Sequence, residues 1–271
     1  AVRGVSFSVA KGETVALVGE SGSGKSVTAL STVGLLPDSA TVTGSVTYQG
    51  RQMVGASEPD LRRVRGNDIS FIFQEPMTSL NPLHSIERQI CESLSLHQGL
   101  EGDNARRRAI ELLNKVGIRN AIERLTAYPH QLSGGQRQRA MIAMALANGP
   151  ELLLADEPPT ALAVTVHAQI LDLLADLKAK DGLSRLVITH DLAIVRRIAD
   201  RVCVMKGGEI VESGPTAEVF ANPQHPYTQT LLAAEPKGRP DPVATDAPEV
   251  ISADALRVWF PIQRGFMRKV V

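Results

Sequence analysis

Residues 19–26 carry the clearest chemical pattern in the sequence. They fit G-x-x-x-x-G-K-[ST] and lie between a strand-like run and a helix-like run. Glycines let successive backbone N–H groups converge on phosphate oxygens, and a helix N-terminus adds partial positive charge. A flexible Gly/Ser turn is the alternative reading. We predict a nucleoside triphosphate site made of Gly19, Glu20, Ser21, Gly22, Ser23, Gly24, Lys25, Ser26 and Val27.

Within this pattern, two side chains have distinct chemistry. Lys25 is expected to reach the β and γ phosphates, and the hydroxyl of Ser26 is expected to hold Mg²⁺.

A pair of carboxylates follows a second apolar run. Residues 152–155 read Leu-Leu-Leu-Ala and are followed by Asp156 and Glu157. At the carboxyl end of a buried strand, Asp156 is placed to hold the metal and Glu157 to orient or deprotonate an attacking water. A lone pair of this kind is more often two solvated acids at a strand end, but the phosphate-binding pattern upstream favours the catalytic interpretation.

The elements that must position these residues follow a strand and helix alternation. Apolar strand-like runs at 69–73, 151–155, 186–189 and 202–205 are separated by helix-period stretches, including 25–36, 104–116 and 137–146. This alternation predicts an α/β fold with a mostly parallel sheet that is buried on both faces. Strands are also predicted at 5–9, paired with 15–18, and at 42–49. Residues 76–148 show almost no strand pattern and predict a helical insertion subdomain.

Composition narrows the class of protein. The 271 residues are 43% hydrophobic and carry 29 basic and 29 acidic side chains, which predicts a globular chain without a global field for nucleic acid or anionic lipid. No apolar run approaches the roughly 20 residues that cross a bilayer, and no signal peptide is visible, so we expect a cytosolic chain. Two cysteines are too few for a disulfide scaffold or a zinc ribbon.

The run Leu132-Ser133-Gly134-Gly135-Gln136 completes a set of motifs that resembles the ABC-type ATPases. In the order of that family, the chain shows a Walker A match at 19–26, a Q-loop match at Gln74, the signature match at 132–136, a Walker B match at 152–157 and an H-loop match at His190. The resemblance implies a P-loop NTPase with a RecA-like, mostly parallel sheet core, an antiparallel β subdomain and a helical insertion subdomain.

The resemblance also implies roles for these residues. Ser133, Gly134, Gly135 and Gln136 would close over ATP held by the P-loop of a second cassette, so that this chain alone would hydrolyse ATP poorly. Gln74 would ligate Mg²⁺ or the attacking water, and His190 would contact the γ-phosphate. The other histidines have no such context, and no catalytic role is expected for them.

Two further runs resemble the peptide and nickel importer subgroup, at 75–82 and at 222–228. They imply the ATP-binding subunit of an oligopeptide or dipeptide importer, associated with the cytoplasmic face of the inner membrane. Its partners would be transmembrane permease subunits, a second cassette and, indirectly, a periplasmic substrate-binding protein. Nucleic acid is not an expected partner.

The C-terminal part suggests a second domain. A proline-rich run at 235–249 predicts a linker between a nucleotide-binding domain at 1–234 and residues 250–271. Leu256, Val258 and Phe260 alternate as in the opening strand of a second cassette, which resembles the tandem peptide-transporter ATPases of the Yej type. A C-terminal strand of the first domain is the alternative.

The chain departs from the family at two places, and two alternative functions are considered. Ala163 stands where the D-loop usually has an aspartate, which favours a catalytically weak regulatory cassette as one alternative. The aromatic residue that stacks on adenine is expected upstream of Ala1. An ABC ATPase that acts on nucleic acid or the ribosome is the other alternative, but it would be expected to show a long coiled coil or a basic insertion.

Overall fold

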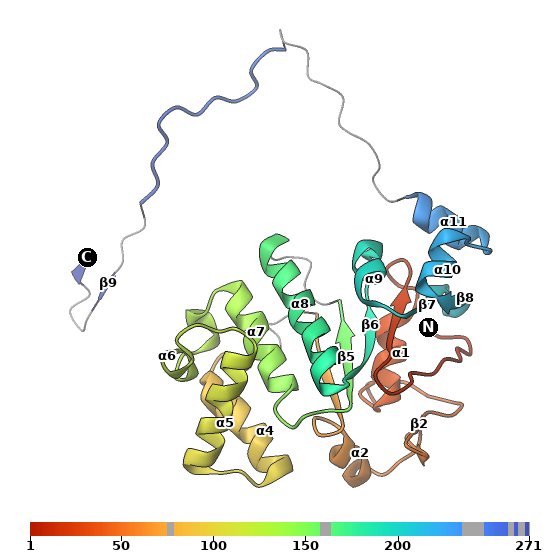
Figure 1. Cartoon of the computed structure of the whole chain (residues 1–271), viewed down its shortest axis with the longest axis horizontal. Coiled ribbons are helices and arrows are strands. Elements are labelled where there is room, and N and C mark those ends of the chain that lie inside the picture. The colour runs from red at the N-terminus through yellow and green to blue at the C-terminus, as the bar shows by residue number, and fades with distance from the viewer. Residues whose placement is uncertain (75–78, 158–163, 235–246, 260–262, 265–268, 271) are drawn as a thin grey trace. The chain divides into compact units, whose positions relative to one another are not determined.

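The computed structural model describes residues 1–74, 79–157, 164–234, 247–259, 263–264 and 269–270 (Figure 1). Contacts divide the chain into two units, Ala1–Glu235 and Pro236–Val271. The second unit contains the short antiparallel pair β9 (Gln263–Arg264) and β10 (Lys269–Val270). All other helices and strands of the described residues belong to the first unit.

The first unit is built on a mixed sheet with the order β4-β5-β6-β1-β7-β8. The neighbours from β4 to β7 run parallel, and β8 is antiparallel to β7. The strands are β1 (Thr14–Val18), β4 (Ile69–Ile72), β5 (Leu152–Asp156), β6 (Ser184–Ile188), β7 (Arg201–Lys206) and β8 (Glu209–Pro215). A separate antiparallel pair joins β2 (Thr47–Tyr48) and β3 (Arg51–Gln52). The mostly parallel sheet is as predicted.

Helices cover both faces of this sheet, as the strand β1 illustrates. Val15 and Leu17 pack in a cluster with residues of α1 (Lys25–Thr32) and α2 (Glu58–Val64). Ala16 and Val18 pack in a second cluster with residues of α9 (Leu192–Ile198), α10 (Thr216–Ala221) and α11 (Pro226–Ala233). Because successive strand residues point to opposite faces, a strand buried on both faces is apolar throughout. This explains the continuous apolar run at 15–18.

The predicted helical insertion is confirmed between β4 and β5. Its helices are α4 (Ile86–Gln98), α5 (Gly102–Lys115), α6 (Ala121–Leu125), the 3₁₀ turn η1 (Pro129–Gln131) and α7 (Gly134–Ala145). Their apolar residues form one cluster with Leu153 and Ala155 of β5 and with residues of α8 (Val164–Asp181). The described residues contain no helix with both the length and the hydropathy of a membrane span.

Some predicted boundaries are wrong. Residues 5–9 form no strand, although Val5, Phe7 and Val9 alternate in burial and pack against the sheet. The alternation reports which face is buried, but a strand also needs a backbone partner. Just before this segment, Arg3 N–H donates to Gly208 O at 2.7 Å. The predicted strand at 42–49 is reduced to β2.

The end of one predicted helix and the start of one predicted strand also differ from the structure. Helix α1 ends at Thr32, well before Pro37, and is followed by Gly34 in a left-handed conformation (φ 63°). Among the described residues 247–259, none lies in a strand, and Leu256, Val258 and Trp259 are exposed. The expected strand beginning near Leu256 is therefore absent from these residues, and Phe260 lies outside those described.

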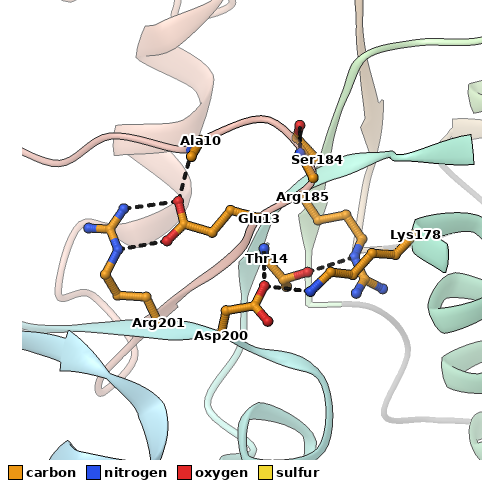
Figure 2. Close-up of polar contacts among 9 residues, drawn as sticks. Ala10, Glu13, Thr14, Lys178, Ser184, Arg185, Asp200 and Arg201 are labelled. Carbon is orange, nitrogen blue, oxygen red and sulfur yellow. Dashed lines mark hydrogen bonds and ion pairs between the residues drawn. The ribbon is translucent and has the colours of Figure 1, made fainter.

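A polar network closes the amino-terminal edge of the sheet, away from the motif residues (Figure 2). Arg185 is 2% exposed, and its Nε donates to Thr14 Oγ1 at 3.0 Å. Asp200 accepts hydrogen bonds from Thr14 N–H at 2.7 Å and from Lys178 Nζ at 2.5 Å. Arg201 pairs with Glu13 at 2.8 Å. The network ties the starts of β1, β6 and β7 to helix α8.

Candidate nucleotide site

The loop after β1 folds around the side chain of Lys25. This lysine is 5% exposed, and its Nζ donates to Gly19 O and Glu20 O at 2.8 Å each. Burial lowers the pKa of Lys25, while the carboxylates of Glu157 and Asp156 raise it. In the loop, Glu20, Ser21 and Gly22 are exposed, Ser23, Gly24 and Lys25 are buried, and Ser26 and Val27 are half-buried. The loop therefore holds a buried cationic group beneath three exposed residues.

Helix α1 begins without a side-chain cap. Its N-cap is Gly24, in a left-handed conformation with φ 99°, and no side chain accepts a hydrogen bond from the first turn. The first N–H groups of a helix need an external acceptor, and phosphate is a suitable one. The local backbone therefore matches the phosphate-binding role predicted for this loop.

The strand order brings the other motif residues to one sheet edge. Because β4, β5, β6 and β1 are parallel neighbours, their carboxyl ends meet at the same edge. Gln74 follows β4, Glu157 follows β5 and His190 follows β6, while the P-loop follows β1. Residues that are far apart in sequence thus converge at the carboxyl edge.

Glu157 lies at the centre of this group. Its Oε2 accepts a hydrogen bond from Gln74 Nε2 at 2.9 Å, and its Oε1 lies 3.0 Å from His190 Nδ1. The backbone N–H of Glu157 donates to Ile188 O at 2.7 Å. Its φ of 44° is in the left-handed region, where residues other than glycine are uncommon and functional sites are over-represented. Glu157 therefore contacts both of the other predicted catalytic residues, Gln74 and His190.

Ser26 and Asp156 form the second contact of the site. Ser26 Oγ donates to Asp156 Oδ1 at 2.9 Å. Burial, and to a smaller extent the nearby carboxylate of Glu157, raise the pKa of Asp156. The hydrogen bond from Ser26 and the charge of Lys25 lower it, but the pKa stays above its ordinary value. The described residues hold no cluster of three or more His, Cys, Asp or Glu side chains with metal-site geometry. A cation here would instead rely on hydroxyl and carboxylate oxygens, which suit Mg²⁺.

The Ser-Gly-Gly run opens helix α7. Ser133 is the N-cap: its Oγ accepts from Gln136 N–H at 3.3 Å, and Gln136 Oε1 accepts from Ser133 N–H at 3.1 Å. Ser133 and Gly134 are exposed, and Gly135 and Gln136 are half-buried. Helix α7 packs in the cluster of the helical insertion, whereas α1 packs with α2 in a separate cluster (Figure 1). Within one chain, these four residues therefore do not join the P-loop.

One contact of the P-loop was not predicted from the sequence. The hydroxyl of Tyr227, in α11, accepts a hydrogen bond from Glu20 N–H at 3.0 Å. The only signal for it is the run at 222–228, which was assigned to a subgroup but not to a role. The predicted D-loop residue Ala163 lies outside the described residues.

Family models match most of the chain. A model described as "ABC transporter" matches residues 2–160, and one described as "Oligopeptide/dipeptide transporter, C-terminal region" matches residues 211–254. The first match includes the P-loop, Gln74, the signature run and the two carboxylates. The second includes Tyr227.

Curated relatives agree with these matches. The chain is 62% identical over 273 residues to the "Peptidoglycan transport ATP-binding protein YejF" of Agrobacterium fabrum, covering 100% of this chain and 50% of the relative. It is 51% identical over 238 residues to the "Oligopeptide transport ATP-binding protein AppD" of Bacillus subtilis, covering 87% of this chain and 73% of the relative. The chain thus spans about half the length of relatives such as YejF.

Solved structures show the same architecture. The ATP-binding cassette MJ0796, solved as a dimer in a post-hydrolysis state with ADP and Pi, superposes with a TM-score of 0.70 at 31% identity. The superposition covers 79% of this chain and 90% of that cassette.

Proposed function

The chain belongs to the ABC transporter family, and from this premise we propose that it binds and hydrolyses ATP to power a peptide importer. The names of the relatives support peptide or peptidoglycan fragments as the class of cargo. Because those relatives extend well beyond this chain, its activity, cargo and partners are proposals.

The observation that carries the proposal is the contact group around Glu157. Its two carboxylate oxygens are held by Gln74 at 2.9 Å and by His190 at 3.0 Å, at the sheet edge where the P-loop also begins. We propose Glu157 as the general base that orients and deprotonates the attacking water, with His190 and Gln74 fixing its carboxylate. Lys25 binds the β and γ phosphates and stabilises the charge that develops on them.

Mg²⁺ fits the donor set next to this group. Ser26 Oγ and Asp156 Oδ1 are 2.9 Å apart, and the amide oxygen of Gln74 is not used in its contact with Glu157. When bound, Mg²⁺ would supply positive charge that offsets the negative charge of the phosphates. Ser26 would ligate it directly, Asp156 directly or through water, and Gln74 through its amide oxygen.

We propose that the remaining phosphate contacts come from a second cassette. Ser133, Gly134, Gly135 and Gln136 begin α7 with exposed or half-buried backbone, which suits an anion from outside the chain. That partner would be another copy or a second cassette in the same protein. Permease subunits in the membrane would be moved by closure of the pair, and a periplasmic binding protein would deliver the cargo.

The domain limits belong to the same proposal. We place the nucleotide-binding domain at 1–234, a linker at 235–249 and the start of a second nucleotide-binding domain at 250–271. The doubled length of the relatives and the exposed apolar side chains of Leu256, Val258 and Trp259 support it. The protein would work at the cytoplasmic face of the inner membrane, without nucleic acid.

Glu157→Gln tests the catalytic proposal. The substitution keeps the size and the contacts of the side chain but removes the base, so ATP turnover should fall by about 100-fold or more, with ATP affinity nearly unchanged. Steady-state phosphate release and nucleotide titration measure the two quantities.

Glu151→Gln is the matched control. Glu151 immediately precedes β5, at its opposite end, where its carboxylate accepts from Tyr48 Oη at 3.1 Å. This variant should turn over ATP at the unmodified rate. Equal turnover of the Glu157→Gln variant and the unmodified chain would refute the assignment and favour a catalytically weak regulatory cassette.

A further inference from the structure

The function proposed above assigns no role to the run Asn222-Pro223-Gln224-His225-Pro226-Tyr227-Thr228. Several hydrogen bonds nevertheless fix this run in the fold. Glu212 of β8 accepts hydrogen bonds from Gln224 N–H at 2.8 Å and from His225 N–H at 3.0 Å. Burial raises the pKa of Glu212, whereas these and other hydrogen bonds lower it. The hydrogen bonds outweigh burial, so the pKa of Glu212 lies below its ordinary value. His225 then caps helix α11, because its Nδ1 accepts from Tyr227 N–H at 3.1 Å.

This support fixes the side chain of Tyr227 against the P-loop. Tyr227 is 6% exposed and packs in the cluster that also contains Val18 of β1. Lys206 Nζ lies 4.7 Å from the centre of its ring. Its hydroxyl oxygen, at the end of this rigid side chain, accepts from Glu20 N–H at 3.0 Å.

That hydrogen bond holds the peptide group between Gly19 and Glu20. In a trans peptide, the N–H and the C=O point in opposite directions, and all described peptides are trans. Tyr227 binds the N–H of this peptide, and Lys25 Nζ binds its carbonyl, Gly19 O, at 2.8 Å. The two side chains therefore hold one peptide group from its two sides.

Gly19 cannot fix this orientation by itself. A Cβ at this position would lie 2.1 Å from Met205 O, so only glycine fits against the end of β7. Glycine has the widest choice of backbone conformations, and the Gly19 φ of 148° is one that other residues rarely adopt. The orientation of the peptide therefore depends on its two hydrogen-bond partners.

We infer that Tyr227 is a positioning residue for the P-loop. Its hydroxyl holds Gly19 O, the acceptor of the Lys25 ammonium, in place and thereby sets the affinity for nucleotide. This inference rests on the proposed function, since it concerns the same loop. It assigns a role to the 222–228 run: the segment from Glu212 to α11 presents a hydroxyl to the loop that binds phosphate. In this proposal, Tyr227 acts through the loop and not on the nucleotide.

Tyr227→Phe tests the inference, because it removes the hydroxyl and keeps the ring. We expect the Kd for ATP and the KM to rise about fivefold, as expected for the loss of one hydrogen bond, while kcat changes less than twofold. Tyr48→Phe is the matched control, since it removes a hydroxyl that bonds to Glu151 at 3.1 Å instead of to the P-loop. An unchanged Kd in Tyr227→Phe, or an equal rise in both variants, would overturn the inference.

Amide hydrogen exchange provides a test that does not need the variant to fold. In the unmodified chain, Glu20 lies outside every helix and strand, so its amide should be protected only through Tyr227. Rapid exchange at Glu20 would overturn the inference. If the unmodified chain bound no ATP, the proposed function would fail, and Glu20 exchange would still decide whether Tyr227 fixes the loop.

Discussion

At the scale of single residues, Glu157 contacts Gln74 and His190, which follow the strands on either side of β5. Lys25, Ser26, Asp156 and Glu157 were predicted from local patterns. The left-handed backbone of Glu157 and its contacts with two neighbouring strand ends were not, because they depend on the order of strands in the sheet. Sequence patterns report neighbours along the chain, whereas a catalytic group is completed by neighbours across it.

Asp156 shows a conflict between stability and function at this scale. Burial raises its pKa above the ordinary value for aspartate. A carboxyl with a raised pKa in the folded state favours folding when protonated, so its ionised form destabilises the ligand-free protein at neutral pH. Asp156→Asn should therefore melt at a higher temperature at pH 7, and the gain should disappear as the pH falls through the raised pKa. Thermal melting without nucleotide between pH 7 and pH 4 measures this.

The same variant should lose Mg²⁺-dependent ATP turnover by about 100-fold, because the amide is a weaker ligand than the carboxylate. Ser26 Oγ can still donate to the amide oxygen of Asn, so the local hydrogen bond is kept. A lower melting temperature of Asp156→Asn at pH 7 would contradict the raised pKa.

At the scale of elements, strands and helices with a buried apolar pattern were predictable, and those whose identity depends on a backbone partner were not. The runs at 69–73, 151–155, 186–189 and 202–205 became β4, β5, β6 and β7 with small shifts of their ends. Residues 5–9 show the expected alternation of burial without a strand. Alternation predicts the side that packs, but hydrogen bonding between strands is a property of the pair.

The buried Arg185 was also outside the reach of sequence reasoning, since β6 reads as an apolar strand. Its Nη1 is buried and has no hydrogen-bond partner among the residues that the structure describes, while its Nε relies on Thr14 Oγ1 (Figure 2). Removing that acceptor leaves a second donor unsatisfied, which costs about 1–3 kcal/mol, whereas removing the charged group and filling its space is often neutral.

Thr14→Val should therefore lower the melting temperature by roughly 3–8 °C, and Arg185→Leu should leave it within about 2 °C of the unmodified chain. The backbone contact from Thr14 N–H to Asp200 is kept in both variants. Chemical denaturation of the two variants, side by side, measures which of them is less stable. If Arg185→Leu were the less stable variant, Arg185 would be stabilising the sheet edge by a net contribution.

At the scale of the whole molecule, the two motifs that we propose to bind phosphate lie in different parts of the described chain. The P-loop and the carboxylates lie at the carboxyl edge of the sheet, and the Ser133 turn begins α7 in the helical insertion. We identified both from sequence motifs, and we propose that both bind phosphate. Their separation within the described chain follows from the fold, and it is the physical reason to propose a second cassette.

The last prediction concerns this pairing. In the Glu157→Gln background, where hydrolysis is stopped, ATP and Mg²⁺ should convert the chain from monomer to dimer. Adding Ser133→Ala should keep the chain monomeric, although the P-loop still binds ATP.

Ser133→Ala also removes a helix N-cap, which costs about 1 kcal/mol by itself. Ser57→Ala separates the two effects, because Ser57 caps α2 through Asp60 N–H in the same way and lies outside the proposed interface. Analytical ultracentrifugation should therefore find dimers for Ser57→Ala and monomers for Ser133→Ala at equal ATP occupancy. Dimers in both would show that the turn at Ser133 does not close over the nucleotide of a partner.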